Sequence, residues 1–155
     1  MGCDIHGWVE VKKDYLDWWD GVIRIDRLVE RNYVMFACLA NVRNYDEVKP
    51  ISDPRGIPSD VSDEAKKDIE GWGEDGHSHS WLTWKEIKEY DWSNNKYYEH
   101  RVIEFTRNGI KEVEPEWKPM KEAISSGWEL LFDLMERLAK DYGDENVRLV
   151  FWFDN

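Results

Sequence analysis

The segment VRLVFWFDN, residues 147–155, constrains the fold more than any other part of the sequence. It is apolar at successive positions rather than at alternate ones, a pattern typical of a strand covered on both faces. A strand of this kind lies at the centre of a sheet, with other elements packed over both faces. The sequence therefore predicts a layered fold built around residues 147–155.

A β-hairpin is predicted at the start of the chain. Residues 3–12, CDIHGWVEVK, alternate in the way expected of a strand with one buried face. Its two predicted faces are Cys3, Ile5, Val9 and Val11 on one side, and Asp4, His6, Trp8 and Glu10 on the other. Residues 21–26, GVIRID, predict the second strand of the hairpin.

Four segments predict helices: residues 31–42, 63–72, 84–90 and Pro119 to about Lys140. Ser62 is the expected N-cap of the second, while Thr83 and Glu86 form a capping-box pattern before the third. Proline is common in the first helical turn, so Pro119 is expected to begin the fourth. The apolar stripe of that helix is Ile124, Trp128, Leu131, Met135 and Leu138.

The remaining segments predict loops and one further hairpin. Residues 43–60 contain three prolines and predict a long irregular loop, and residues 71–81 predict a loop between two helices. Residues 93–113 predict a hairpin that turns at RNG, with Val102, Phe105 and Ile110 buried. We therefore expect one α+β domain over residues 1–155. Its small mixed or antiparallel sheet, formed by the N-terminal hairpin and the C-terminal strand, would pack against helices.

The charge of the chain restricts its partners. A formal net charge of −12 argues against binding to nucleic-acid phosphates, which takes a basic surface. An acidic surface could imitate DNA or meet a basic partner, but the acidic residues are interspersed with Lys and Arg, which favours a role in solubility. No apolar run has the length of a membrane span, and the first residues do not form a secretion signal, so a cytoplasmic protein is expected.

Two short histidine motifs suggest a polar site. Asp4 and His6 would project from the same face of a strand, and His77 and His79 would do the same if their segment is extended. Together these four residues would offer three imidazoles and one carboxylate, a set that suits a divalent transition metal such as Zn or Mn. Asp75 could be a further ligand or could orient a ligand histidine.

The same residues allow other interpretations. Without a metal, His6, His77, His79 and Asp75 could act as general acids and bases near neutral pH. A purely structural alternative is that the histidines only satisfy backbone groups of a loop. Cys3 could pair with His6 or His77 as a nucleophile, whereas Cys38 lies in an apolar segment and is expected in the core.

Arginine and tryptophan residues suggest the class of ligand. Arg43 and Arg55 lie in or beside the irregular loop, where a guanidinium can hold phosphate or carboxylate. Trp72 and Trp81 flank the second histidine motif and could stack on a planar ring. Combined with the histidines, they indicate an anionic ligand that carries a ring, for which a nucleotide is the natural candidate. The structural alternatives are surface ion pairs and core packing.

Several segments together resemble a family of small proteins carried by bacteriophages and prophages: MGCDIH, RNYVMFACLANVRN, PRGIPSDVS, GEDGHSHSWLT and VRLVFWFDN. The resemblance implies a phage context and transfers no catalytic residue. Residues 91–118 carry none of it. In that context we expect an accessory protein, directed against host defence, that binds or hydrolyses a small nucleotide signal, with phosphodiester hydrolysis as the expected reaction if it is an enzyme. The alternatives are sequestration of the nucleotide without catalysis, and an acidic inhibitor of a host defence protein. A second copy of the chain is a further candidate partner.

Overall fold

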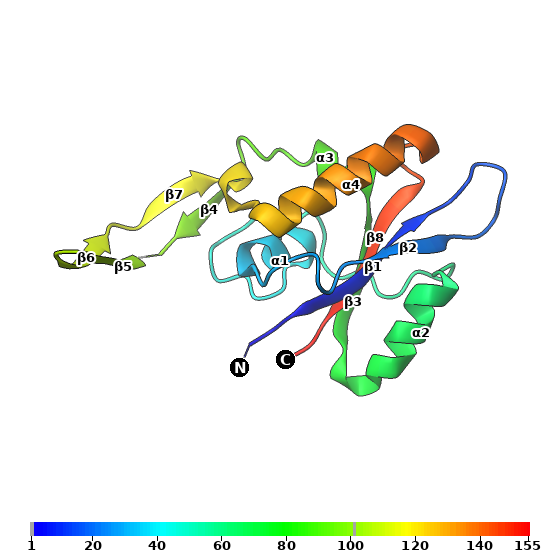
Figure 1. The fold of residues 1–155 in the computed structure, drawn as a ribbon, viewed down its shortest axis with the longest axis horizontal. Coiled ribbons are helices and arrows are strands. Elements are labelled where there is room, and N and C mark those ends of the chain that lie inside the picture. Colours follow the sequence, from blue (N-terminus) through cyan, green and yellow to red (C-terminus); the bar gives the residue numbers. More distant parts are fainter. Residues whose placement is uncertain (1, 101) are drawn as a thin grey trace.

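The strand predicted at the centre of the sheet is found there. The computed structural model describes residues 2–100 and 102–155, and only the backbone of residues 102 and 103. Its main sheet is antiparallel, with the strand order β2-β1-β8-β3 (Figure 1). The bounds of these strands are Ile5–Val11 for β1, Asp20–Arg24 for β2, His77–Thr83 for β3 and Val147–Phe153 for β8. All seven residues of β8 are buried, which confirms the prediction from their composition.

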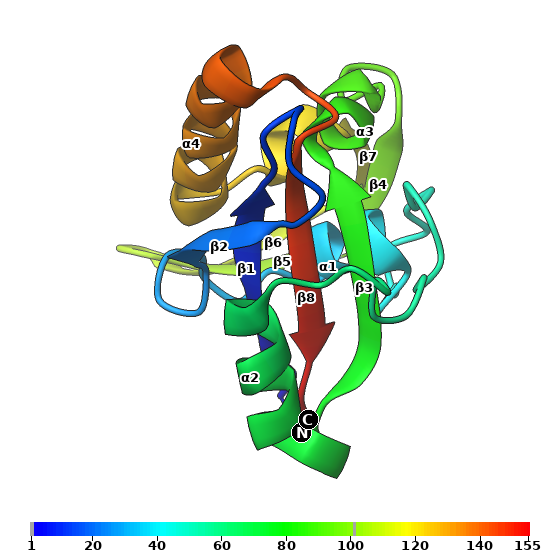
Figure 2. The same cartoon turned by 90° about the vertical axis from the view of Figure 1, so that its right-hand side faces the viewer.

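Helices cover both faces of this sheet, as the buried strand requires. The helices are α1 (Tyr33–Ala40), α2 (Asp63–Trp72), α3 (Trp84–Glu89) and α4 (Ser126–Tyr142), with short 3-10 turns η1 (Gly73–Asp75) and η2 (Met120–Ala123). Figures 1 and 2 show α1 and α4 on one face and α2 on the other. The α+β prediction is therefore confirmed.

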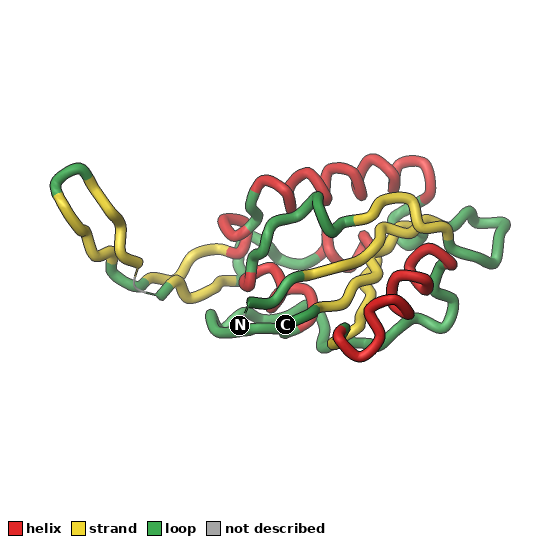
Figure 3. Tube along the Cα trace, turned by 60° about the horizontal axis from the view of Figure 1, so that its bottom comes forward, coloured by secondary structure: helices red, strands yellow, loops and turns green. Residues whose placement is uncertain are grey.

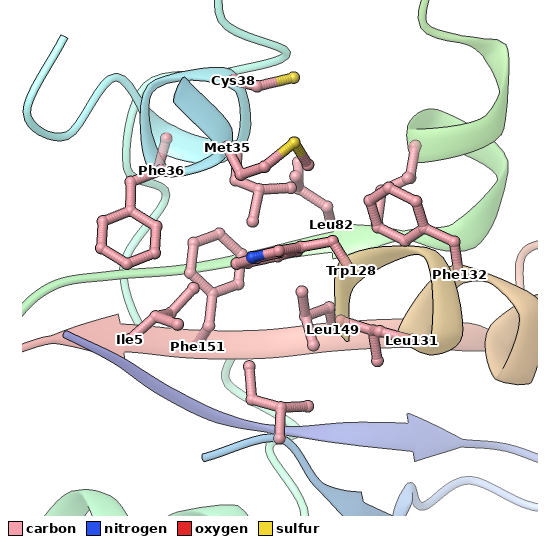
Figure 4. Close-up of a cluster of buried hydrophobic side chains, with 14 of the residues drawn as sticks. Ile5, Met35, Phe36, Cys38, Leu82, Trp128, Leu131, Phe132, Leu149 and Phe151 are labelled. Carbon is pink, nitrogen blue, oxygen red and sulfur yellow. The ribbon is translucent and has the colours of Figure 1, made fainter. Parts of the chain in front are cut away.

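Successive residues of β8 enter two separate hydrophobic clusters. Leu149 and Phe151 lie in the larger cluster beneath α1 and α4, together with Trp128 of α4 (Figure 4). Val150 and Trp152 lie in a smaller cluster with residues of α2. The alternation of a strand places these neighbours on opposite faces of the sheet.

The predicted starts of the second and third helices are correct, and the first helix begins two residues later than predicted, at Tyr33. Ser62 accepts a hydrogen bond from the backbone of Ala65, and Thr83 forms the capping box with Glu86. The fourth helix was predicted to begin at Pro119 but begins at Ser126. Pro119 instead ends a strand with an extended backbone, at φ −66° and ψ 144°. A φ near −65° suits an extended proline as well as a helical one, so the residue alone does not fix the helix start.

The prediction of a loop over residues 71–81 was wrong at both ends, because residues 71 and 72 belong to α2 and residues 77–81 lie in a strand. Residues 43–60 form the irregular loop expected of them, but η1 and the edge strand β3 occupy residues 73–83. None of the helices in the described part of the chain is long and apolar enough to cross a membrane.

The predicted hairpin near RNG exists, but it stands away from the body. Strand β4 (Lys96–Glu99) pairs with β7 (Glu116–Pro119), and β5 (Val102–Thr106) pairs with β6 (Gly109–Val113). Figures 1 and 3 show these two small sheets as an arm that projects from one side of the molecule. The predicted burial is wrong for Phe105 and Ile110, which are 84% and 67% exposed. The side chain of Val102 lies outside the described part.

Candidate functional site

The two predicted halves of the site lie at the same end of the main sheet. His6 of β1 is opposite Trp152 of β8, and His77 of β3 is opposite Phe153. Neighbouring strands are about 4.8 Å apart, so β8 separates the β1 and β3 backbones by about 10 Å. Both chain ends also lie here (Figure 2), where Asp154 donates its backbone N–H to the carbonyl of Asp4 at 3.1 Å.

His6 lies between two carboxylates. Its Nδ1 is 2.8 Å from Asp26 Oδ2, and its Nε2 is 2.8 Å from Asp154 Oδ2. The imidazole also packs on Trp72, with 4.1 Å between the ring centroids. Burial lowers the pKa of His6, but the hydrogen bonds to Asp26 and Asp154 outweigh burial and raise the pKa above its ordinary value. This arrangement favours the imidazolium and engages both ring nitrogens.

The raised pKa of His6 predicts a pH dependence of stability. Its contribution is fully present below the ordinary pKa of 6.5 and is lost as the pH rises through the raised pKa of the folded protein. We expect the free energy of unfolding, measured by urea titration, to decrease over this range in the wild type. His6→Gln should remove that decrease, whereas the matched His100→Gln change on the exposed arm should keep it. An unchanged pH profile in His6→Gln would contradict the assignment.

Asp4 is engaged by an arginine beside His6. Arg31 donates to its two carboxylate oxygens at 2.9 and 3.0 Å, and these hydrogen bonds lower the pKa of Asp4 despite some burial. Asp4 and His6 both help to line a hollow of about 290 Å³. The remaining lining residues are Ile5, Asp26, Val29 and Arg31.

His77 and His79 do not share a face of β3, contrary to the prediction. The His77 ring stacks on Phe153, whereas the His79 ring stacks on Trp152, and these two residues of β8 point to opposite faces. Ser78 between them has a φ of 54°, and the pairing with β8 shifts register there. A bulge of this kind interrupts the alternation of side chains. Burial, followed by the nearby His77, lowers the pKa of His79.

The predicted metal ligands are not gathered into one group. Within residues 2–100 and 102–155, no set of three or more His, Cys, Asp or Glu side chains is placed to hold a metal ion. Asp4 is paired with Arg31, His6 is held by two aspartates, and His79 lies on the opposite face from His77. The expected Zn or Mn ion therefore has no ligand group among the described residues.

A second hollow lies at the C-terminal end of β8. It has a volume of about 510 Å³ and is lined by Trp72, Glu74, Asp75, His77, Asp154 and Asn155. The predicted residues Trp72, Asp75 and His77 thus come together, and His6 lies behind Trp72 and Asp154. We call this cavity the terminal hollow.

An oxygen atom at the terminal hollow is held between a guanidinium and an imidazole. Arg43 Nη2 donates to Asn155 Oδ1 at 3.1 Å, and His77 Nε2 is 3.2 Å from the same oxygen. His77 Nδ1 is 2.9 Å from the hydroxyl of Ser78. With that hydroxyl donating to Nδ1, the proton of neutral His77 is on Nε2, where it can be donated to the oxygen.

Arg43 and Arg55 differ in how their charges are used. Arg43 bonds to the Tyr45 hydroxyl and to Asn155, and it makes no ion pair among the residues that the structure describes. Arg55 forms an ion pair with Glu86 and also stacks over Trp81, with 4.8 Å to the ring centroid. Arg55 and Trp81 are therefore occupied with each other and with Glu86. Arg43, Arg55 and Trp81 all lie outside the lining of the terminal hollow, and Arg43 reaches it through its hydrogen bond to Asn155.

Both cysteines are free and buried. Burial raises the pKa of Cys3, more than the nearby Arg43 lowers it, and burial raises the pKa of Cys38 to about 12. A raised thiol pKa disfavours the nucleophilic thiolate, so the geometry gives no support to the alternative of a Cys3 nucleophile. Cys38 is in the core, as predicted.

Sequence reasoning missed a buried ionic network on the α2 side of the sheet. Arg148 Nε donates to Glu10 Oε1 at 2.6 Å, and its Nη1 donates to Asp60 Oδ1 at 2.9 Å. Glu10 is 0% exposed and also accepts the backbone N–H of Ser62 at 2.8 Å. The signal was present in the sequence, because an arginine inside an otherwise apolar central strand needs a buried anionic partner.

Asp26, Asp154 and Asn155 were also missed as site residues. Asp26 ends the predicted strand GVIRID, and Asp154 and Asn155 are the two residues that follow the apolar run FWF. Comparison of the chain with protein-family models, with curated proteins and with solved structures gives no match. The site is therefore interpreted from its geometry.

Proposed function

We propose that the protein binds a small nucleotide in the terminal hollow, with a phosphate oxygen between Arg43 and His77. The observation that carries the proposal is Asn155 Oδ1, an oxygen that already accepts from both residues. Guanidinium and imidazole N–H groups are standard phosphate donors, and charge-assisted bonds of this kind are strong. Asn155 is exposed, so its side chain can move aside and leave its place to a ligand oxygen.

The rest of the hollow supports a ligand with a ring and hydrogen-bond donors. Trp72 contributes an indole, while Asp75 and Asp154 contribute carboxylate oxygens that accept from the amino groups of a base. The same carboxylates repel phosphate. They would therefore orient the ligand, with its base toward Trp72 and its phosphate toward Arg43.

The geometry favours binding over hydrolysis. A phosphodiesterase needs a group that activates water, but both nitrogens of His6 are engaged by Asp26 and Asp154, those of His77 face Ser78 and Asn155, and His79 Nε2 is buried. We therefore favour sequestration of the nucleotide over phosphodiester hydrolysis. In the phage context implied by the sequence resemblance, sequestration would lower the concentration of a host defence signal in the infected cell.

We expect Arg43→Gln to weaken nucleotide binding roughly 10- to 100-fold, because a hydrogen bond to a charged group contributes about 1.5–3 kcal/mol. The measurement is isothermal titration calorimetry with a panel of mononucleotides and cyclic dinucleotides, and with inorganic phosphate as a separate probe. Arg137→Gln is the matched control, because Arg137 is an exposed residue of α4 with the same charge.

Two further measurements decide between the alternatives. Asn155→Asp places a carboxylate between Arg43 and His77 and should also weaken binding, whereas Asn155→Ala should not. Chromatography of the nucleotide after heat denaturation of the complex should recover it intact, and a cleaved product would favour hydrolysis instead. Equal affinities for the wild type and Arg43→Gln would contradict the proposed phosphate site.

A second candidate function is an acidic inhibitor that binds a basic surface of a host protein. It is favoured by a hollow lined by carboxylates and the half-exposed Trp18. The lining residues are Trp18, Trp19, Asp20, Asp60, Val61, Ser62, Asp63 and Glu64. This function predicts no nucleotide binding, so the calorimetric panel separates the two candidates.

A further inference from the structure

The outer hairpin of the arm, β5 and β6, leaves the side chains of residues 104–112 uncovered. The two strands form a sheet of their own, at the end of the arm away from the body (Figures 1 and 3). Every residue from Glu104 to Glu112 is exposed. Phe105 and Ile110 are direct cross-strand partners and therefore form one apolar patch.

Such a hairpin is poorly stable when nothing packs on it. An isolated two-stranded ribbon is marginal in water, and it gains stability when an apolar face is covered. Here the exposed hairpin carries a phenylalanine and an isoleucine that nothing covers. The arm therefore has the properties of a surface that is covered by another molecule.

The distribution of charge favours a second copy of the chain as that molecule. Residues 102–113 contain two basic residues, Arg107 and Lys111, and two acidic residues, Glu104 and Glu112, so their net charge is zero. The whole chain carries −12, which therefore lies entirely outside this hairpin. Two copies that meet through their hairpins can thus associate without bringing their acidic bodies together.

The reach of the arm makes this separation effective. Four residues of β4 and five of β5, at about 3.3 Å each, give strand lengths of about 13 and 17 Å. The Debye length at physiological ionic strength is about 8 Å, so repulsion between bodies held that far apart is largely screened. If the hairpin docked directly on the acidic body of a second copy, the two bodies would lie closer together and repel each other more strongly.

The ends of the hairpin also carry opposite charges. Arg107 is at the tip and Glu114 follows β6 at the base; both are exposed and make no ion pair among the described residues. In a two-fold arrangement with the hairpins antiparallel and the patches face to face, each Arg107 would point toward the base of the second copy and come within about two residues, or about 7 Å along the strand, of its Glu114. The charges are therefore complementary in that arrangement and in no parallel one.

We propose that two copies of the chain associate through their arms, with the Phe105–Ile110 patches packed face to face and the hairpins antiparallel. The test is sedimentation velocity of the full-length protein over a range of concentrations. The wild type should shift from monomer to dimer, and the double variant Phe105→Thr, Ile110→Thr should stay monomeric. Leu130→Gln, which removes a half-exposed apolar residue from the body, is the control and should dimerise like the wild type.

A charge exchange tests the antiparallel arrangement. Arg107→Glu and Glu114→Arg should each weaken the dimer several-fold, and the double exchange should restore it. The far-UV circular dichroism spectrum should not change, because these residues lie outside the core. A wild type that is monomeric at every concentration would overturn the proposal and assign the patch to a different macromolecule. A dimer that the Phe105 and Ile110 changes leave intact would overturn it as well.

Discussion

Replacing Arg148 by methionine is expected to lower the free energy of unfolding by about 3–5 kcal/mol. The guanidinium is the buried partner of Glu10, which is itself fully buried, and it also holds Asp60. Without it, a carboxylate remains in the interior with no cation beside it. The penalty arises from that uncompensated charge and exceeds the net contribution of the ion pair.

The measurement is urea unfolding at neutral pH, with Arg137→Met as the control for loss of an exposed arginine, expected within about 0.5 kcal/mol of the wild type. Adding Glu10→Gln to Arg148→Met should recover part of the loss, because it removes the buried charge. A loss below about 1 kcal/mol in Arg148→Met would show that Glu10 is not buried as described.

The second large effect is expected for Gly7→Ala, at about 3 kcal/mol or more of lost stability. Gly7 pairs with Phe151, and a Cβ at position 7 would lie 2.3 Å from the Val150 carbonyl oxygen and 2.9 Å from Phe151 Cα. These are backbone atoms of β8, so the clash cannot be relieved by rotating a side chain. The strands would have to separate next to His6.

Gly71→Ala is the matched control for that substitution. Nothing lies within 4 Å of a Cβ at position 71, and the residue is inside α2. Alanine is favoured over glycine in a helix by roughly 0.5–1 kcal/mol, so this variant should be more stable than the wild type. Thermal unfolding of both variants gives the comparison, and a Gly7→Ala protein that melts with the wild type would contradict the close approach of β1 and β8.

The strands and helix starts could be predicted where a local pattern determines the structure. Residues 149–153 are apolar on both faces, a pattern typical of a central strand, and Ser62 and Thr83 have cap functions set by their immediate neighbours. The exposure of the hairpin arm could not be predicted in this way. Phe105 and Ile110 have the residue types of a core, and only the tertiary arrangement leaves them outside.

The site was predictable in its location but not in its contacts. Alternation placed Asp4 and His6 on one side, but it could not show that Asp26 and Asp154 would engage both nitrogens of His6, because that depends on strand pairing across the whole chain. His77 and His79 were assigned to one face by simple alternation. A single positive φ at Ser78 reverses that assignment, and a serine gives no signal of it in the sequence.

The position of β8 between β1 and β3 has a consequence for the rate of folding. Ile5 pairs with Phe153, so the central pairing of the sheet joins residues from opposite ends of the sequence. Closing a loop of that length costs conformational entropy before any contact between the strands can offset the cost. Proteins dominated by such distant contacts therefore fold slowly. The β1–β2 hairpin can form early, but its apolar face stays exposed until β8 is added. During that interval the chain is most prone to aggregation. The net charge of −12 then opposes association, because partly folded chains repel one another.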